Sequence, residues 1–233
     1  MVDSLKYEIL PKDYHNYDLS FKIMFIGDST VGRSALLMTL SHGSYQDPCV
    51  PTIGCDIFTF NIKIEDKIIK LFMWDCPGQE KYQSLLSSLY RNTNLVVISY
   101  CINNKGSFDN IKKWLNDARR FCNDDCKFFL IGNKADLESE RIVSKEEGEK
   151  LAKEENFDFF IETSSIKGLN IQKIPIQAAK IFYLSWIKYN QKSETKKIKN
   201  IKLKNLPNIK PKEKTKIIKG KKFENLLMKY FSY

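Results

Sequence analysis

The sequence contains few histidines and no long apolar run, and both absences narrow what the chain can do. Only His15 and His42 occur among the 233 residues. The six cysteines (positions 49, 55, 76, 101, 122 and 126) lack the spacing of a disulfide framework, and no signal peptide precedes them. Cys122 and Cys126 have no histidine partner nearby, which argues against zinc. No apolar stretch approaches the roughly 20 residues that cross a bilayer. We therefore expect a cytoplasmic chain with reduced thiols.

Negative charge is scarce at one end of the chain. Residues 191–233 contain 14 Lys and 3 Glu, a net charge of +11, whereas the whole chain carries +10. Residues 1–190 are therefore nearly neutral. A high isoelectric point can indicate nucleic-acid binding, but here the charge belongs to one terminal segment without a nucleic-acid module. We expect no nucleic-acid partner.

The alternation of apolar runs and amphipathic segments predicts an α/β domain over residues 20–190. Strands are expected at 21–26, 56–64, 68–74, 95–102, 127–131 and 157–161, and helices at 35–40, 111–122, 144–155 and 169–189. The strands at 56–64 and 68–74 form a hairpin, while the others alternate with helices. This order predicts a mostly parallel sheet covered on both faces. Residues 1–19 are expected to be an irregular extension, and 191–233 a Lys-rich tail.

The stretch Gly27–Ser34 has the pattern of a phosphate-binding loop between a strand and a helix. Its glycines allow a tight turn, and its N–H groups form an anion nest beside the helix N-terminus. Ser34 places a hydroxyl where Mg²⁺ would lie between two phosphates. Arg33 stands where the pattern has lysine, and its broad, planar guanidinium would contact the phosphates with a different geometry from that of a compact ammonium. An ordinary glycine-rich turn is the alternative. The candidate phosphate contacts are Ser29, Thr30, Val31, Gly32, Arg33 and Ser34.

A second motif, residues 75–80, closes the predicted strand at 68–74. Asp75 at a strand end can hold Mg²⁺ through water. Gly78 can present its N–H to a γ-phosphate, and Gln79 can orient an attacking water. A plain turn is the alternative for this stretch taken alone.

A third motif, Asn133-Lys134-Ala135-Asp136, follows the predicted strand at 127–131. Ionised Asp136 is an acceptor only, so it matches the two adjacent donors on the Watson–Crick edge of guanine. Adenine would leave that carboxylate poorly paired, which disfavours an ATP-directed protein. Lys134 can lay its methylene stem over the base, and Asn133 can tie the loop together.

These motifs resemble those of the Ras superfamily of small GTPases, and of its Rab branch in particular. Residues 52–56 (TIGCD) resemble the Rab switch I sequence, and residues 71–80 resemble the Rab segment containing WDTAGQE. Tyr90-Arg91 and residues 162–165 (ETSS) also have Rab counterparts. The resemblance covers about residues 18–190. It implies an α/β P-loop GTPase G domain with a mostly parallel six-stranded sheet, one antiparallel edge hairpin strand and helices on both faces.

The resemblance also implies GTP or GDP and Mg²⁺ as cofactors. Tyr45 corresponds to an aromatic residue that packs edgewise on the base, and the backbone of residues 164–166 to a loop at the guanine carbonyl. Gln79 corresponds to the catalytic glutamine, and we expect Arg33 to act with it. The expected metal ligands are Ser34, Thr52 and Asp75, and the expected base-loop residues are Ser164, Ser165 and Ile166.

The implied function is a GTP/GDP switch that hydrolyses GTP slowly in vesicle trafficking. Its switch regions, Gly43–Ile53 and Cys76–Arg91, would bind effectors, exchange factors and activating proteins, and we expect a monomer. Arg33 and Pro77 depart from the Rab pattern at the phosphate site, and Ile166 departs from it at the base loop. The alternative is a hydrolysis-impaired GTP-binding scaffold, similar to the unprenylated Rab-like proteins of ciliary transport.

The tail lacks the usual lipid-anchor signals. The last cysteine is Cys126 and residue 2 is valine, so neither prenylation nor myristoylation is expected. Lys192–Lys222 should be disordered in isolation. Five apolar residues near the end share one helical face: Phe223, Leu226, Leu227, Tyr230 and Phe231. We expect the tail to contact an anionic membrane or a protein groove, with a solvated tail as the alternative, and the protein to be cytoplasmic or peripheral on an endomembrane.

Overall fold

The computed structural model describes residues 4–45, 55–76 and 88–204. Three predicted site residues, Thr52, Gly78 and Gln79, lie outside these ranges, as does the predicted apolar helix face at 223–231. Contacts divide the chain into residues 1–184 and residues 185–233.

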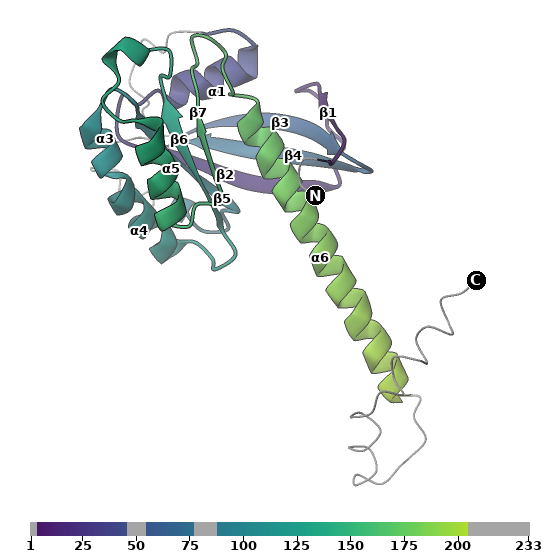
Figure 1. Ribbon diagram of the computed structural model, residues 1–233. Coiled ribbons are helices and arrows are strands. Elements are labelled where there is room, and N and C mark those ends of the chain that lie inside the picture. Colours follow the sequence, from purple (N-terminus) through teal and green to yellow (C-terminus); the bar gives the residue numbers. More distant parts are fainter. Residues whose placement is uncertain (1–3, 46–54, 77–87, 205–233) are drawn as a thin grey trace. The chain divides into compact units, whose positions relative to one another are not determined.

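One mixed sheet organises residues 1–184 (Figure 1). Its strands lie in the order β1-β3-β4-β2-β5-β6-β7. The central strands β4, β2, β5, β6 and β7 are parallel to one another, whereas β3 is antiparallel to β4 and β1 is antiparallel to β3. The predicted mostly parallel sheet is confirmed. The bounds are β1 Tyr7–Leu10, β2 Leu19–Gly27, β3 Asp56–Ile64, β4 Lys67–Asp75, β5 Leu95–Cys101, β6 Lys127–Asn133 and β7 Phe159–Glu162.

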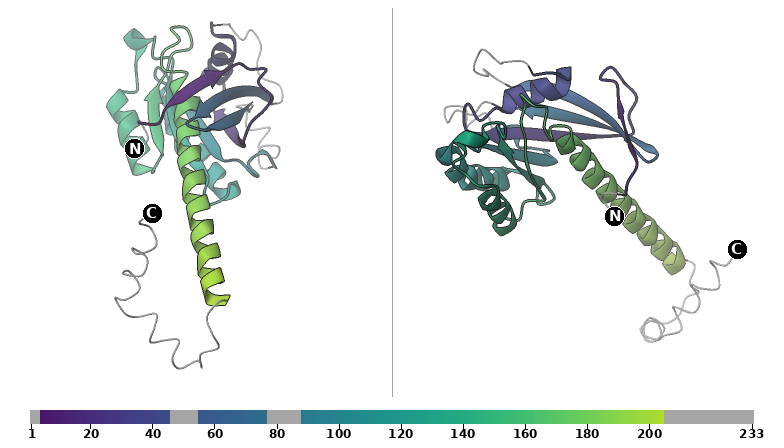
Figure 2. Two further views of the ribbon diagram at one scale, coloured as in Figure 1. Left: turned by 90° about the vertical axis from the view of Figure 1, so that its right-hand side faces the viewer. Right: turned by 45° about the horizontal axis from the view of Figure 1, so that its top comes forward.

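The sheet has one strand more than the predicted six, because part of the N-terminal extension is regular. β1 pairs with β3 from Tyr7↔Ile64 to Leu10↔Asn61, and both views in Figure 2 show it at the edge of the sheet. The buried amide of Asn61 donates to the carbonyls of Pro11 and Lys12, at 2.8 and 3.0 Å. These bonds hold the turn that follows β1. The irregular extension expected for residues 1–19 is therefore wrong over Tyr7–Leu10.

Helices cover both faces of the sheet. Met24 and Ile26 of β2 share a buried cluster with Leu115 of α4. Side chains alternate along a strand, so Phe21 points to the other face, where its ring stacks on Phe182 of α6 with centroids 4.2 Å apart. The helices are α1 Arg33–His42, α3 Lys105–Asp109, α4 Ile111–Phe121, α5 Lys145–Glu154 and α6 Lys173–Lys204, with a 3₁₀ turn at Glu138–Glu140.

A capping box begins α5. The Ser144 hydroxyl accepts from the Glu147 backbone N–H at 3.1 Å, and the Glu147 carboxylate accepts from the Ser144 N–H at 2.8 Å. The two bonds satisfy donors that the first turn of a helix leaves without partners.

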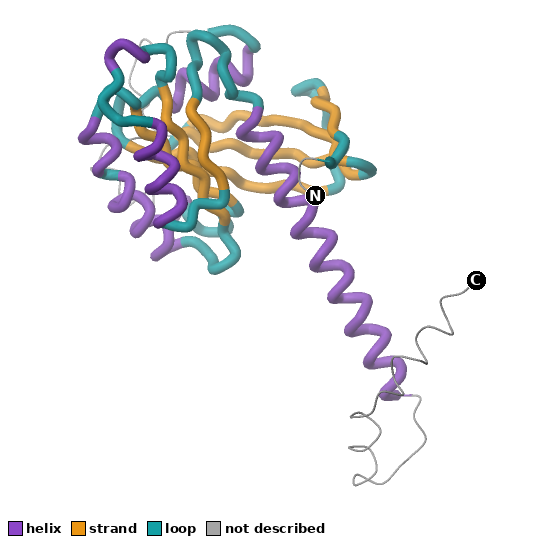
Figure 3. Tube along the Cα trace, viewed as in Figure 1, coloured by secondary structure: helices purple, strands orange, loops and turns teal. Residues whose placement is uncertain are grey.

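The last helix differs from its prediction at both ends. It begins at Lys173, after residues in which Ser164 bridges to Leu169. It then runs through Lys204, as Figure 3 shows in one colour, so the disorder predicted over Lys192–Lys222 is wrong as far as Lys204. Extending an existing helix adds one hydrogen bond per residue without a new nucleus, and lysine and glutamate favour helix.

No helix within the described ranges combines the length and apolarity needed to cross a membrane.

Gly148, inside α5, is predicted to be indispensable for packing. A Cβ there would lie 2.5 Å from the Tyr100 hydroxyl oxygen and 2.6 Å from Cζ of Phe160. Alanine favours helix over glycine by about 1 kcal/mol, but overpacking costs about 1–3 kcal/mol. We expect Gly148→Ala to lower the free energy of unfolding in urea titrations. Exposed Glu149→Ala is the control and should change it by less than about 0.5 kcal/mol. A Gly148→Ala protein more stable than wild type would contradict this packing.

Candidate functional site

Four strand ends meet at one edge of the sheet. Phe25 of β2 is in register with Asp75 of β4, and Gly132 of β6 with Glu162 of β7. The loops after β4 and β2 therefore leave the sheet side by side, as do those after β6 and β7, and β5 alone separates the two pairs. In parallel α/β sheets this carboxyl edge is where ligands bind. The three motifs predicted from the sequence all begin here.

The loop after β2 turns through unusual backbone conformations. Thr30 and Gly32 have φ angles of +65° and +94°. A Cβ on Gly32 would lie 2.6 Å from the Asn133 amide nitrogen, so the loop can pass this close only with glycine. Lys134 Cε is 3.7 Å from the same point. The phosphate loop and the Asn133–Asp136 motif are thus in direct contact.

The side chain of Asn133 connects three loops. It is 1% exposed, and its Nδ2 donates to the Val31 carbonyl at 2.9 Å. Its Oδ1 accepts from the Thr163 hydroxyl at 3.0 Å. The loop-tying role predicted for Asn133 is what this geometry provides.

The loop after β7 fixes the orientation of Asp136. The Ser164 hydroxyl, fully buried, donates to Asp136 Oδ1 at 2.5 Å and accepts from the Lys167 N–H at 3.1 Å. Asp136 keeps its second carboxylate oxygen for another donor. Of the other two predicted base-loop residues, Ser165 is buried and Ile166 is 61% exposed.

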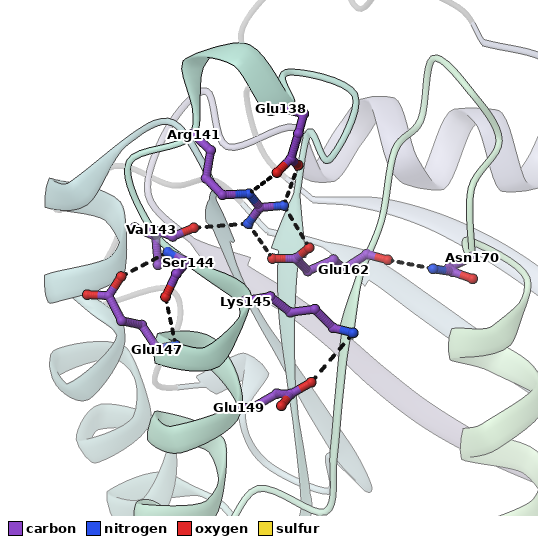
Figure 4. Close-up of polar contacts among 9 residues, drawn as sticks. All are labelled: Glu138, Arg141, Val143, Ser144, Lys145, Glu147, Glu149, Glu162 and Asn170. Atoms are coloured by element: carbon purple, nitrogen blue, oxygen red, sulfur yellow. Dashed lines mark hydrogen bonds and ion pairs between the residues drawn. The ribbon is translucent and has the colours of Figure 1, made fainter.

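Glu162, at the end of β7, is held by a network of charged side chains (Figure 4). Arg141 donates to both of its carboxylate oxygens, at 2.7 and 2.9 Å, and also binds Glu138 through two bonds. These carboxylates raise the pKa of Arg141 above its ordinary value. The Glu162 carbonyl accepts from Asn170 at 2.9 Å. The network anchors the strand from which the base loop departs.

Ser34 and Asp75 form the candidate metal site. The Ser34 hydroxyl, in the first turn of α1, donates to Asp75 Oδ2 at 2.5 Å, and Asp75 is 1% exposed at the end of β4. A hydroxyl and a carboxylate are oxygen ligands of the kind that Mg²⁺ takes, directly or through water. The donor set of these two residues fits the ion. Thr52, the third predicted ligand, lies outside the described residues.

Arg33 folds back onto the loop that precedes it. Its Nη1 donates to the carbonyls of Gly27 and Asp28, the latter at 3.0 Å, and its Nε lies 3.7 Å from Asp75 Oδ1. Only 6% of its side chain is exposed. Burial lowers the pKa of Arg33, and the Asp75 carboxylate opposes that shift. Arg33 therefore contacts the candidate metal ligand as well as the loop.

Asp28 is a site residue that the sequence reasoning missed. Its Oδ1 accepts from the Trp114 indole N–H and its Oδ2 from the Asn110 amide, both at 2.7 Å. These bonds fasten the phosphate loop to the N-cap residue and the first turn of α4. The partners are more than 80 positions away in sequence, so no local pattern links them to Asp28.

The remaining predicted residues are placed as follows. Tyr45 follows α1 and is 39% exposed. Lys134 has a φ of +62°, and the backbone N–H of the next residue, Ala135, donates to the Thr163 carbonyl at 2.9 Å. The roles proposed for Gln79, Gly78 and Thr52 stay predictions, since the structure does not describe these residues. Ser29, Thr30 and Val31 lie in the loop between β2 and α1, as predicted.

Comparisons with known proteins decide the family. A model of the Ras family matches residues 22–183. This chain belongs to the Ras family. It is 40% identical to Ras-related protein Rab-10 of Diplobatis ommata over 157 residues, which are 67% of this chain and 78% of that protein. The predicted Rab-like membership of the Ras superfamily and the G-domain fold are thereby confirmed.

Two further relatives show the same range of similarity. Ras-related protein Rab-26 of Homo sapiens is 39% identical over 156 residues, which are 66% of this Ras-family chain and 60% of that protein. Ras-related protein RABA6a of Arabidopsis thaliana is 40% identical over 156 residues, 67% of this chain and 66% of that protein. The match thus spans less than two thirds of Rab-26.

The buried contact between Arg33 and Asp75 predicts a large effect on stability. Asp75→Asn removes the charge that compensates a buried guanidinium, and breaking such a pair costs about 3–5 kcal/mol. We expect this loss in urea unfolding of the Ras-family chain freed of nucleotide and metal. Arg33→Met added to Asp75→Asn should restore most of it, because no buried charge is then left alone.

Glu154→Gln is the matched control. It breaks an exposed pair with Lys150, at 3.9 Å, and should cost less than about 0.5 kcal/mol. Equal small losses for Asp75→Asn and Glu154→Gln would show that the Arg33–Asp75 contact does not stabilise the fold.

Proposed function

We propose that this Ras-family chain is a GTP/GDP-dependent switch that hydrolyses GTP to GDP and phosphate. The observation that carries the proposal is the bridge made by Asn133. It joins the loop that suits a polyphosphate to the loop that suits guanine, so one nucleotide can occupy both. Ras-family proteins are GTPases, and the relatives named above are Rab proteins.

Base selection is assigned to Asp136. Its position is fixed by Ser164, and a carboxylate accepts from both the N1–H and the exocyclic amine of guanine. A site built for such donors rejects a base that lacks them, because the carboxylate would then be left unpaired. The stem of Lys134, next to Gly32, supplies an apolar surface for one face of the base.

Phosphate binding is assigned to the loop at 29–34. This loop leads into the start of α1, where the backbone N–H groups of the first turn and the helix dipole stabilise anions. Ser34 and Asp75 are the residues that would hold Mg²⁺, which when bound neutralises charge on the transferring phosphoryl group. Arg33 supplies a fixed positive charge beside these residues, but part of its fork is already used by the Gly27 and Asp28 carbonyls.

Gln79 is the proposed residue that orients the attacking water, and the segments at 43–53 and 76–91 are the proposed switches. Order in these segments would depend on the γ-phosphate and on Mg²⁺. Effectors, exchange factors and activating proteins would recognise the change, in vesicle trafficking. We also propose that the protein is cytoplasmic and becomes peripheral on an anionic endomembrane through its basic tail.

A second candidate follows from the geometry of Arg33. The Arg33 guanidinium is already bound to the loop carbonyls and to Asp75. It can therefore move less than a lysine ammonium could toward the negative charge that develops on the phosphates in the transition state. The chain would then bind GTP without hydrolysing it and would act as a GTP-held scaffold.

Single-turnover hydrolysis of bound GTP separates these two functions. The switch predicts Mg²⁺-dependent conversion to GDP by wild type, at a rate on the order of 10⁻⁴ s⁻¹. Gln79→Leu should slow it at least about tenfold, because general positioning of the nucleophile is lost. Bound nucleotide would be identified by chromatography throughout.

The contradicting result is GTP that stays intact in wild type and is hydrolysed only by Arg33→Lys, which would establish the scaffold. Glu149→Gln, on the exposed face of α5, is the control and should hydrolyse GTP as wild type does.

A further inference from the structure

Cys55 and Cys76 stand opposite each other at the open end of the β3–β4 hairpin. Asp56 is paired with Asp75 in antiparallel register, so the next residue outward on each strand is a cysteine. Directly opposed residues in such a pair have Cα atoms about 4.5–5.5 Å apart. Disulfides span Cα separations of about 4.4–6.8 Å. The backbone is therefore already arranged for a bond between these two side chains.

The two side chains also share one buried environment, because Cys76 belongs to a buried cluster against which Cys55 packs. Both are free cysteines, and the Cys76 thiol donates to the Trp74 carbonyl at 3.8 Å. Cys76 is fully buried, and its backbone N–H donates to the Phe25 carbonyl at 3.2 Å, which keeps it in line with β4. Cys55 is partly exposed. A solvent oxidant can reach Cys55 first, with Cys76 directly behind it.

We propose that Cys55 and Cys76 form a reversible disulfide that makes this protein sensitive to peroxide. The Cys55 sulfur attacks one oxygen of hydrogen peroxide, the O–O bond breaks, and a sulfenic acid and one water result. The Cys76 sulfur then attacks the sulfenic sulfur, which forms the S–S bond and releases a second water. The two thiols lose two electrons and two protons to the peroxide, and a dithiol reductant reverses the change.

The disulfide would connect the C-terminal end of the first proposed switch to the start of the second. Cys55 lies two positions after the end of the segment 43–53, and Cys76 begins the segment 76–91. Asp75, bonded to Ser34, is the residue next to Cys76. Because Asp75 accepts from Ser34 and is adjacent to Cys76, a bond that fixes the hairpin end would restrain the candidate metal site, so the disulfide should slow GDP release. This consequence rests on the proposed function, whereas formation of the bond does not.

The experiment uses the full chain, treated with hydrogen peroxide, blocked with an alkylating reagent and digested with trypsin without reduction. We expect a cross-link between the tryptic peptides 34–63 and 71–81, which a dithiol removes. Peptide 34–63 also contains Cys49, so fragmentation of the cross-link must assign the bond to Cys55. A bond between Cys122 and Cys126 would stay inside peptide 121–127 and cannot be mistaken for it.

Cysteine-to-serine variants test which cysteines form the cross-link. Cys55→Ser should abolish the cross-link, while Cys49→Ser and Cys122→Ser should leave it in place. Cys122 is a suitable control because its thiol is also partly buried and lies four positions from another free cysteine, Cys126. Oxidation should slow release of a fluorescent GDP analogue by at least about twofold in wild type and not in Cys55→Ser.

Three outcomes would overturn parts of this account separately. No cross-link in folded wild type, or one that survives Cys55→Ser, would overturn the disulfide. A cross-link without slower GDP release would overturn its effect on the nucleotide site. Absence of guanine-nucleotide binding, with the cross-link present, would overturn the proposed function and leave the thiol pair standing.

Discussion

The site depends on the two hydrogen bonds made by the side chain of Asn133. One amide, buried at the end of β6, holds the Val31 carbonyl of the phosphate loop and the Thr163 hydroxyl of the base loop. Burying a side-chain amide costs free energy unless its polar atoms form hydrogen bonds, so the burial of Asn133 depends on both loops. In turn, the two hydrogen bonds hold both loops in position. Gly32 is part of the same constraint, because a side chain there would occupy the space of the Asn133 nitrogen.

The strands and most helices could be predicted because their signals are local. β3 was predicted with its observed bounds, and the Ser144–Glu147 capping box has a short sequence signature. β1 could not be predicted, because four residues carry little pattern and the strand depends on the distant amide of Asn61. α3 is only five residues long and was missed for the same reason. β1 also covers the outer edge of β3, which would otherwise present unpaired backbone groups.

The composition of the site was predictable, but its interactions were not. Motif spacing identified the phosphate loop, Asp75 and the Asn133–Asp136 segment, and the sheet register brings them together. The conformation of Arg33 could not be predicted from the sequence. The sequence shows that the residue is charged, but it does not show whether the guanidinium contacts phosphate, backbone carbonyls or Asp75. The bonds that Asp28 accepts from Asn110 and Trp114 join residues more than 80 positions apart and have no local signature. Cys55 and Cys76 were predicted to be reduced thiols, and only the strand register shows that they are opposed.

The central claim is that Asp136 and its loop select a guanine nucleotide, and competition binding tests it most directly. A fluorescent GDP bound to the purified chain would be displaced by unlabelled GDP or by ADP. The account predicts displacement by GDP alone, and a loss of GDP affinity of about 10–100-fold in Asp136→Asn, which removes a charged acceptor worth about 1.5–3 kcal/mol. Glu140→Gln, in the nearby 3₁₀ turn, should bind GDP as wild type does. Equal displacement by GDP and ADP, or unchanged affinity in Asp136→Asn, would contradict the account.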